Sequence, residues 1–256
     1  MEVCAAIVSR MDQAIGRIVT ELEQPEQLDN TLVLFLQDNR GCAETLGRRV
    51  RKGRVSIKPS EPTAPMSPSK LQLDMIPTKI RDGWPVRMGH EAMPGPVDTY
   101  VAYGRGWANV SNTPFREYKH WVHGGGISTP LIAHWPSRIT RKGELEHQPG
   151  HLIDLMATCV DVAVADYPVK IDGIPIHPLE VLSLMQAFQG RLMNRDALYW
   201  EHESNRAIRH GPWKLVARGL KGPWELYRID DDRSELHDLA DQQPEVVAQR
   251  SREWSE

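Results

Sequence analysis

Residues 118–126 bring together the side chains of this sequence that are best suited to chemistry. Lys119 lies between aromatic and histidine neighbours, and a glycine triplet follows at residues 124–126. An ammonium group beside the backbone N–H donors of a glycine-rich turn suits an anionic ligand. Consecutive glycines also let the backbone take positive φ or approach a ligand closely. The pattern indicates an anion-binding site, and a solvated lysine is the alternative.

A second polar group follows the apolar run Thr31-Leu-Val-Leu-Phe-Leu, which ends in Gln37-Asp38-Asn39. Such a run predicts a strand that is covered on both faces in a largely parallel sheet. The carboxylate of Asp38 and the amide of Asn39 are hard oxygen donors, which suit Ca²⁺ or Mg²⁺ better than Zn²⁺. Asx residues after a strand are also common turn formers. Metal ligation and a turn therefore both stay open for this pair.

Three histidines near these segments are further candidates. His120 and His123 precede the glycine triplet and are of a type that binds anions or moves protons. His151 and Asp154 begin a predicted helix over residues 151–163 and could face each other as a ligand pair. A capped helix start is the interpretation that we favour for those two residues.

The elements that must position these residues alternate between helix and strand. From Ala5 to Leu22 apolar residues recur every three or four positions, which predicts an amphipathic helix with one buried face. The apolar run from Ile127 to Trp135 predicts a second buried strand, so the Lys119 cluster would lie at a strand edge. Residues 41–99 have weak periodicity and predict a long loop. Together these patterns indicate an α/β protein.

The texture of the sequence changes beyond residue 192. ALYWEH, RAIRHGPWKLVA and WELYRI are short runs of aromatic and branched residues, and Gly/Pro turns separate them. They predict a small antiparallel sheet. The segment from Pro244 to Trp254 predicts a terminal helix.

Composition excludes several classes of protein. The 256 residues carry a net charge of −3, which gives no global attraction to nucleic acid. Six basic residues lie between Arg48 and Lys58, and a solvated loop is favoured there over a nucleic-acid arm. Mean hydropathy is −0.46, and no apolar run approaches the length of a membrane span. The three cysteines are widely spaced and suggest no disulfide framework, and the N-terminus does not resemble a signal peptide.

Several segments resemble the sulfatase family, in particular its bacterial arylsulfatase type. TLVLFLQDNRG is similar to the family's strand end, where an apolar run precedes Asp-Asn-Gly-Gly. NTPFREYKHWVHGGGISTPLIAHWP is similar to the stretch in which a Lys stands five residues before Glu-Gly-Gly. HLIDLMAT resembles the helix that follows. RAIRHGPWKLV and WELYRIDDDRSELHDLA resemble the C-terminal subdomain. The matches keep the family's order through nearly the whole chain.

This resemblance implies an alkaline-phosphatase-like α/β/α sandwich with a small C-terminal antiparallel-sheet subdomain. It also implies calcium-dependent hydrolysis of sulfuric esters by a formylglycine, which the family makes from Cys or Ser in C/S-x-P-x-R. By motif, Asp38 and Asn39 fall on Ca²⁺ ligands, and Lys119 falls on the lysine that contacts sulfate during catalysis. His120 and His123 occupy no known catalytic position.

The sequence departs from the family pattern in four places. It contains no C/S-x-P-x-R motif, and the early Asp-Asp calcium pair is also missing. Arg40 stands where the family has the first Gly after Asp-Asn, which would strain the backbone and place a positive charge beside the metal position. Gly124 replaces the family's Glu, so a carboxylate near Lys119 is expected to be lost.

We therefore expect a partial sulfatase whose N-terminal portion is missing. Residues 1–192 would form the C-terminal part of the core domain, and residues 193–256 would form the subdomain. The chain alone should be inactive, and exposed apolar surface should reduce its solubility. One alternative is a half-enzyme that a separately encoded N-terminal chain complements. Another is a non-catalytic protein that binds a metal or a sulfated ligand. The expected partner is a sulfate ester, with no nucleic acid and no membrane span. The compartment stays open, since full-length relatives are usually periplasmic or secreted.

Overall fold

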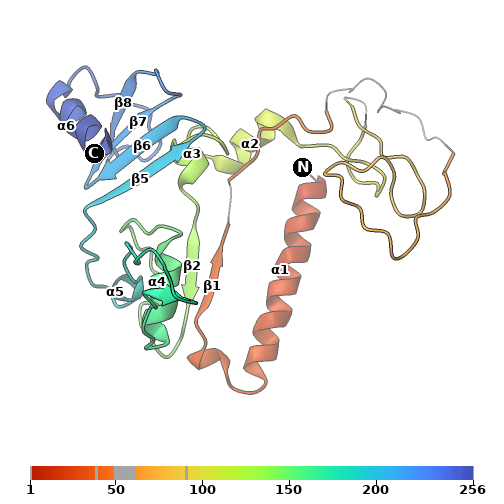
Figure 1. Cartoon of the computed structure of the whole chain (residues 1–256), viewed down its shortest axis with the longest axis horizontal. Helices are drawn as coiled ribbons and strands as arrows, with labels where there is room; N and C mark the ends of the chain where they lie inside the picture. Colours follow the sequence, from red (N-terminus) through yellow and green to blue (C-terminus); the bar gives the residue numbers. More distant parts are fainter. Residues whose placement is uncertain (1, 38–39, 49–60, 90–91, 256) are drawn as a thin grey trace. The chain divides into compact units, whose positions relative to one another are not determined.

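The computed structural model describes residues 2–37, 40–48, 61–89 and 92–255 (Figure 1). It divides the chain into two compact units. The first comprises Met1–Ala14 and Asn39–Ser128, and the second comprises Ile15–Asp38 and Thr129–Glu256. The domain division that the sequence predicts at residue 192 lies within the second unit and stays a prediction.

Helix α1 spans Glu2–Glu23 and confirms the helix expected over residues 5–22. The expectation of a buried face is wrong, because none of the described residues of α1 is buried. Ile7 is 63% exposed and Ile18 is 62% exposed. The apolar periodicity is therefore present, but no described element covers that stripe.

A short 3₁₀ helix, η1 (Leu28–Asn30), leads into strand β1 (Val33–Leu36), as the apolar run predicts. β1 pairs antiparallel with β2 (Leu131–His134), so the parallel neighbours that the sequence predicts are not among the described strands. β1 is half-buried rather than fully covered, and β2 is largely exposed, with Ile132 58% exposed. Continuous apolarity correctly predicted both strands, but the predicted burial is wrong for both, and apolarity cannot specify their partners.

The loop expected over residues 41–99 forms neither helix nor strand in its described part. An isolated bridge joins Arg87 to Thr99, and the Arg87 guanidinium donates two hydrogen bonds to Asp98, at 2.6 and 2.9 Å. The hydrogen bond from Arg87 is the main cause that lowers the pKa of Asp98. Of the basic run, Arg48 is described, and its guanidinium donates to the carbonyls of Ala102 and Tyr103. The rest of that run lies outside the described residues.

Two short helices complete the first unit. α2 spans Gly104–Asn112, and α3 spans Gly124–Ile127. The turn that carries Lys119 lies between them.

In the second unit, α4 (Asp154–Val162) lies within the helix expected over residues 151–163, but its N-cap residue, Ile153, makes no side-chain cap hydrogen bond, so the expected capped start is not formed. Asp154 is fully buried and accepts hydrogen bonds from the backbone N–H of His151 at 2.8 Å and from the Arg195 guanidinium at 2.5 Å. The carboxylate thus closes the turn before the helix and neutralises a buried arginine. Burial lowers the pKa of His151, because the charged imidazolium is disfavoured there.

A small apolar cluster supports this part of the second unit. Helix α5 (Met185–Phe188) contributes to a core of Leu184, Ala187 and Met193, against which Leu155 of α4 packs. A minimal hairpin of β3 (Lys170–Ile171) and β4 (Ile174–Pro175) lies in the intervening loop.

The predicted C-terminal sheet is confirmed as four antiparallel strands in sequential order. These strands are β5 (Ala197–His202), β6 (Asn205–His210), β7 (Trp213–Ala217) and β8 (Trp224–Arg228). The β5–β6 turn has positive φ at both central residues, Glu203 and Ser204, as a tight hairpin requires. Gly211, with φ of 58°, divides the single run RAIRHGPWKLVA into β6 and β7.

The terminal helix is confirmed as α6 (Pro244–Ser255), whose side chains join the core of Ile208, Leu215 and Leu226. Lys214 of β7 and Glu235 form an ion pair in which both side chains are almost fully buried. None of the described helices is long and apolar enough to cross a membrane.

Candidate functional site

Lys119 lies in a turn that the backbone holds in uncommon conformations. Glu117 and His120 flank it with φ of 64° and 85°, in the left-handed region that non-glycine residues rarely adopt. The backbone N–H of Lys119 donates to the carbonyl of Gly41 at 3.0 Å. The Lys119 side chain is 35% exposed, so its ammonium can reach a ligand.

A carboxylate does lie beside Lys119, contrary to the expectation drawn from the loss of Glu at position 124. Glu44 Oε1 is 3.8 Å from Lys119 Nζ and 2.8 Å from His120 Nε2. The hydrogen bond from His120 is the largest of the causes that hold the pKa of Glu44 below its ordinary value, and the charge of Lys119 also contributes. Because an ionised carboxylate only accepts hydrogen bonds, Nε2 of His120 carries the proton that joins the two residues.

Asn112 links the segment after β1 to the Lys119 turn. Its side chain is 1% exposed, its Oδ1 accepts from the Gly41 N–H at 2.9 Å, and its Nδ2 donates to the Glu117 carbonyl at 2.9 Å. Gly41 approaches α2 closely, because a Cβ there would lie 2.9 Å from the Ala108 carbonyl oxygen. One buried amide thus satisfies two backbone groups that are far apart in sequence.

The glycine triplet serves close packing of the chain on itself. None of these three described glycines takes positive φ. A Cβ on Gly125 would lie 2.1 Å from the Glu117 carbonyl oxygen, and one on Gly126 would lie 1.8 Å from that of Trp121. The N–H groups of Gly125 and Gly126 donate to the carbonyls of Arg116 and His123. The expectation that these donors face an anion is therefore wrong, because backbone carbonyls of the same turn accept from them.

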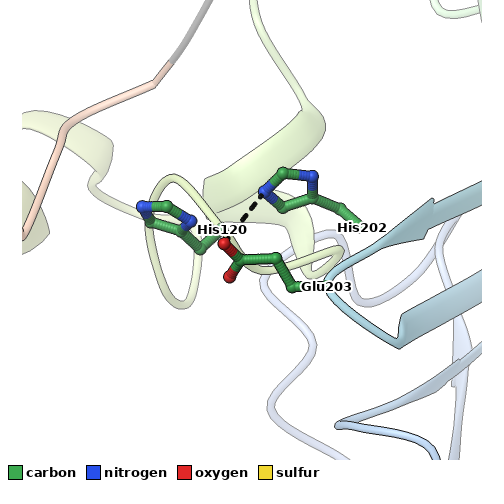
Figure 2. A group of neighbouring side chains, drawn as sticks. All are labelled: His120, His202 and Glu203. Carbon is green, nitrogen blue, oxygen red and sulfur yellow. Dashed lines mark ion pairs between the residues drawn. The ribbon is translucent and has the colours of Figure 1, made fainter.

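The histidines have distinct settings. His123 is fully buried and occupies the N-cap position of α3. Figure 2 draws the side chains of His120, His202 and Glu203. In the β5–β6 turn, His202 Nε2 lies 4.0 Å from Glu203 Oε1. The His202–Glu203 pair is exposed and belongs to the C-terminal sheet.

The predicted metal ligands Asp38 and Asn39 lie outside the described residues. Arg40, which follows them, places its guanidinium over the Phe115 ring, 4.6 Å from the ring centroid. The guanidinium therefore has an aromatic partner in the first unit.

Glu44 and Asn112 are the residues of this site that the sequence did not point to. Asn112 lies in the NTPF segment that carried the resemblance, but nothing in one sequence marks it as a buried link. Glu44 follows the strand-end motif in a stretch without periodicity.

What the geometry offers is an ammonium group that is fixed at its backbone, partly exposed and flanked by a carboxylate and an imidazole. That set can hold and orient an anionic group.

Two family matches cover almost the entire chain. Residues 1–165 match the sulfatase family, and residues 116–253 match the family described as N-sulphoglucosamine sulphohydrolase, C-terminal. The first match covers more than half of the chain, so this chain belongs to the sulfatase family.

Individual relatives agree with that assignment. The chain is 27% identical to an uncharacterized sulfatase of Schizosaccharomyces pombe, over 99% of this chain and 42% of the relative. It is 27% identical to an arylsulfatase of Klebsiella aerogenes, over 77% of this chain and 36% of the relative. The crystal structure of Ps i-CgsB superposes with a TM-score of 0.60 at 19% identity, over 94% of this chain and 39% of that one. The chain thus has a sulfatase-like mixed α/β fold, and it spans about two fifths of the length of these proteins.

Proposed function

We propose that this chain carries the sulfate-contacting side of a sulfatase active site, in which Lys119 binds the sulfate group of an ester substrate. The observation that supports this most is the backbone bond from Lys119 to Gly41. This hydrogen bond connects Lys119, the proposed contact for sulfate, to the segment that begins two residues after Asn39. The ammonium is exposed enough to meet a substrate, and the family match supplies the reaction class.

Asp38 and Asn39 are the proposed Ca²⁺ ligands. Their carboxylate and amide oxygens have the chemistry that Ca²⁺ prefers, and bound Ca²⁺ would polarise a sulfate oxygen. Two residues are fewer than the 6–8 oxygen ligands that this ion takes. The remaining ligands must come from elsewhere, and the core in which they would meet is proposed to be the alkaline-phosphatase-like α/β/α sandwich.

The chain alone should not hydrolyse sulfate esters. Its sequence contains no C/S-x-P-x-R, so it offers no residue for conversion to the formylglycine nucleophile. The test is an assay of the purified chain with nitrocatechol sulfate in the presence of Ca²⁺. We expect no turnover above that of a Lys119→Met variant. Turnover that disappears in that variant would mean that the chain has its own nucleophile.

A half-enzyme is the second candidate, and exposed apolar surface favours it. Ile7, Val8 and Ile18 of α1 are each more than half exposed, as is Ile132 of β2. Such surface is costly in water and suits contact with a further sulfatase segment. Co-expression with a separately encoded segment that carries C/S-x-P-x-R should then give a stable complex with arylsulfatase activity. A monodisperse monomer that unfolds cooperatively and ignores such a segment would count against this candidate.

A further inference from the structure

The Glu44 carboxylate contacts two side chains at different distances. Its Oε1 lies within hydrogen-bond distance of His120 Nε2, at 2.8 Å, whereas Lys119 Nζ lies 3.8 Å away, beyond that range. The carboxylate therefore neutralises Lys119 partly without taking up its N–H donors. Those donors stay available to a ligand, while the charge of Glu44 restricts where the ammonium can lie.

Hydrogen bonds fix the backbone of the segment that leads into Glu44. Gly41 and Cys42, just before it, donate to Asn112 Oδ1 at 2.9 Å and to the Tyr103 hydroxyl at 3.0 Å. On the other side of the contact, His120 is held at φ of 85° in the turn that Asn112 also anchors. Both partners of the Glu44–His120 hydrogen bond thus belong to backbone segments that other hydrogen bonds hold in place. Glu44 can therefore restrict where the neighbouring Lys119 side chain lies.

We propose that Glu44 is a positioning residue, which fixes the His120 ring and directs the Lys119 ammonium for binding of a sulfate ester. This inference rests on the proposed function of Lys119 and adds a residue to it. Glu44 itself contacts no substrate in this account, because a carboxylate would repel the sulfate group.

A carboxylate beside a lysine could instead compete with the sulfate group for that lysine. The two roles predict opposite results. If Glu44 only competes, removing its charge strengthens binding of an anion in every variant. If Glu44 positions the His120 ring, a variant that keeps a hydrogen-bond acceptor for His120 still binds the anion. A variant that removes the acceptor then loses anion binding.

The test compares Glu44→Gln with Glu44→Ala in the full chain, with nitrocatechol sulfate as the probe and Glu61→Ala as an exposed control in the same unit. We expect Glu44→Ala to weaken binding by about tenfold, the equivalent of about 1.4 kcal/mol. Glu44→Gln and Glu61→Ala should bind within about threefold of the unmodified chain, which is a smaller change than the loss expected for Glu44→Ala. The ¹⁵N resonance of His120 Nε2 should keep its hydrogen-bonded shift in Glu44→Gln and lose it in Glu44→Ala.

Tighter binding in both Glu44 variants would overturn the positioning role, as would an unchanged His120 resonance in Glu44→Ala. If the unmodified chain binds no probe, the proposed function of Lys119 fails. The His120 resonance then still decides whether Glu44 fixes that ring. Far-ultraviolet circular dichroism confirms that each variant is folded.

Discussion

The C-terminal sheet and the Lys119 turn are stabilised in different ways. Strands β5 to β8 follow one another in sequence and in space, and α6 covers a shared core of Ile208, Leu215 and Leu226. The Lys119 turn instead depends on segments that are 71 residues apart in the Gly41–Asn112 contact and 76 apart in the Glu44–His120 contact. The sheet is therefore specified by local pattern, and the candidate site is specified by a few long-range polar contacts.

The largest expected effect lies in the sheet. Lys214→Met leaves the almost fully buried Glu235 carboxylate without this ammonium. Removing one partner of a buried ion pair costs about 3–5 kcal/mol. Urea unfolding followed by tryptophan fluorescence should detect a loss of that size for the sheet.

Two variants sharpen that result. Lys221→Met, on the exposed loop before β8, should leave the midpoint unchanged within error. Adding Glu235→Gln to Lys214→Met should recover part of the loss, because position 235 then carries no buried charge. If Lys214→Met is as stable as Lys221→Met, the buried pair does not stabilise the sheet.

In the Lys119 turn, the largest effect should come from Gly126→Ala. The added Cβ would lie 1.8 Å from the Trp121 carbonyl oxygen, and backbone cannot yield as a flexible side chain can. We expect a cost of about 3 kcal/mol, the upper part of the usual range for overpacking. Thermal unfolding of the first unit measures it.

Gly106 provides the matched control for that substitution. It lies in α2, and a Cβ there would meet nothing within 4 Å. Gly106→Ala should be neutral or should stabilise by up to about 1 kcal/mol through helix propensity. Equal behaviour of the two alanine variants would show that the close approach at Gly126 is not required.

A smaller effect is expected at Asn112. Asn112→Ala leaves the Gly41 N–H and the Glu117 carbonyl without their partner, at a cost of about 2 kcal/mol. Asn109→Ala, which removes an exposed hydrogen bond within α2, should cost less than about 0.5 kcal/mol. Chemical denaturation compares the two, and similar losses would mean that Asn112 does not link the segments.

This contrast explains how far the sequence could predict the structure. Short runs of aromatic and branched residues separated by Gly/Pro turns are enough to predict the C-terminal sheet, because each hairpin closes locally, although the turn at Gly211 divides one predicted run into two strands. The helix α1 can be predicted because its apolar periodicity is also a local feature of the sequence. Its exposed face was not, since periodicity indicates which face is apolar and says nothing about what covers it.

The site was predicted only in part. Motif resemblance led to Lys119, because the spacing of lysine and glycines is a local feature. Glu44 was missed because its contact with His120 depends on a loop that has no periodic signal. The glycine triplet predicts a turn whose N–H groups face a ligand, whereas its lack of side chains serves packing against the carbonyls of Glu117 and Trp121.

The most direct test of the central claim is binding of nitrocatechol sulfate to the full chain, measured by NMR titration. Lys119→Met is compared with Lys70→Met, an exposed lysine of the same unit. We expect the unmodified chain and Lys70→Met to bind alike, and Lys119→Met to lose binding by more than about tenfold, since a charge-assisted hydrogen bond is removed. Equal binding by Lys119→Met and the unmodified chain would contradict the assignment of Lys119 as the sulfate contact.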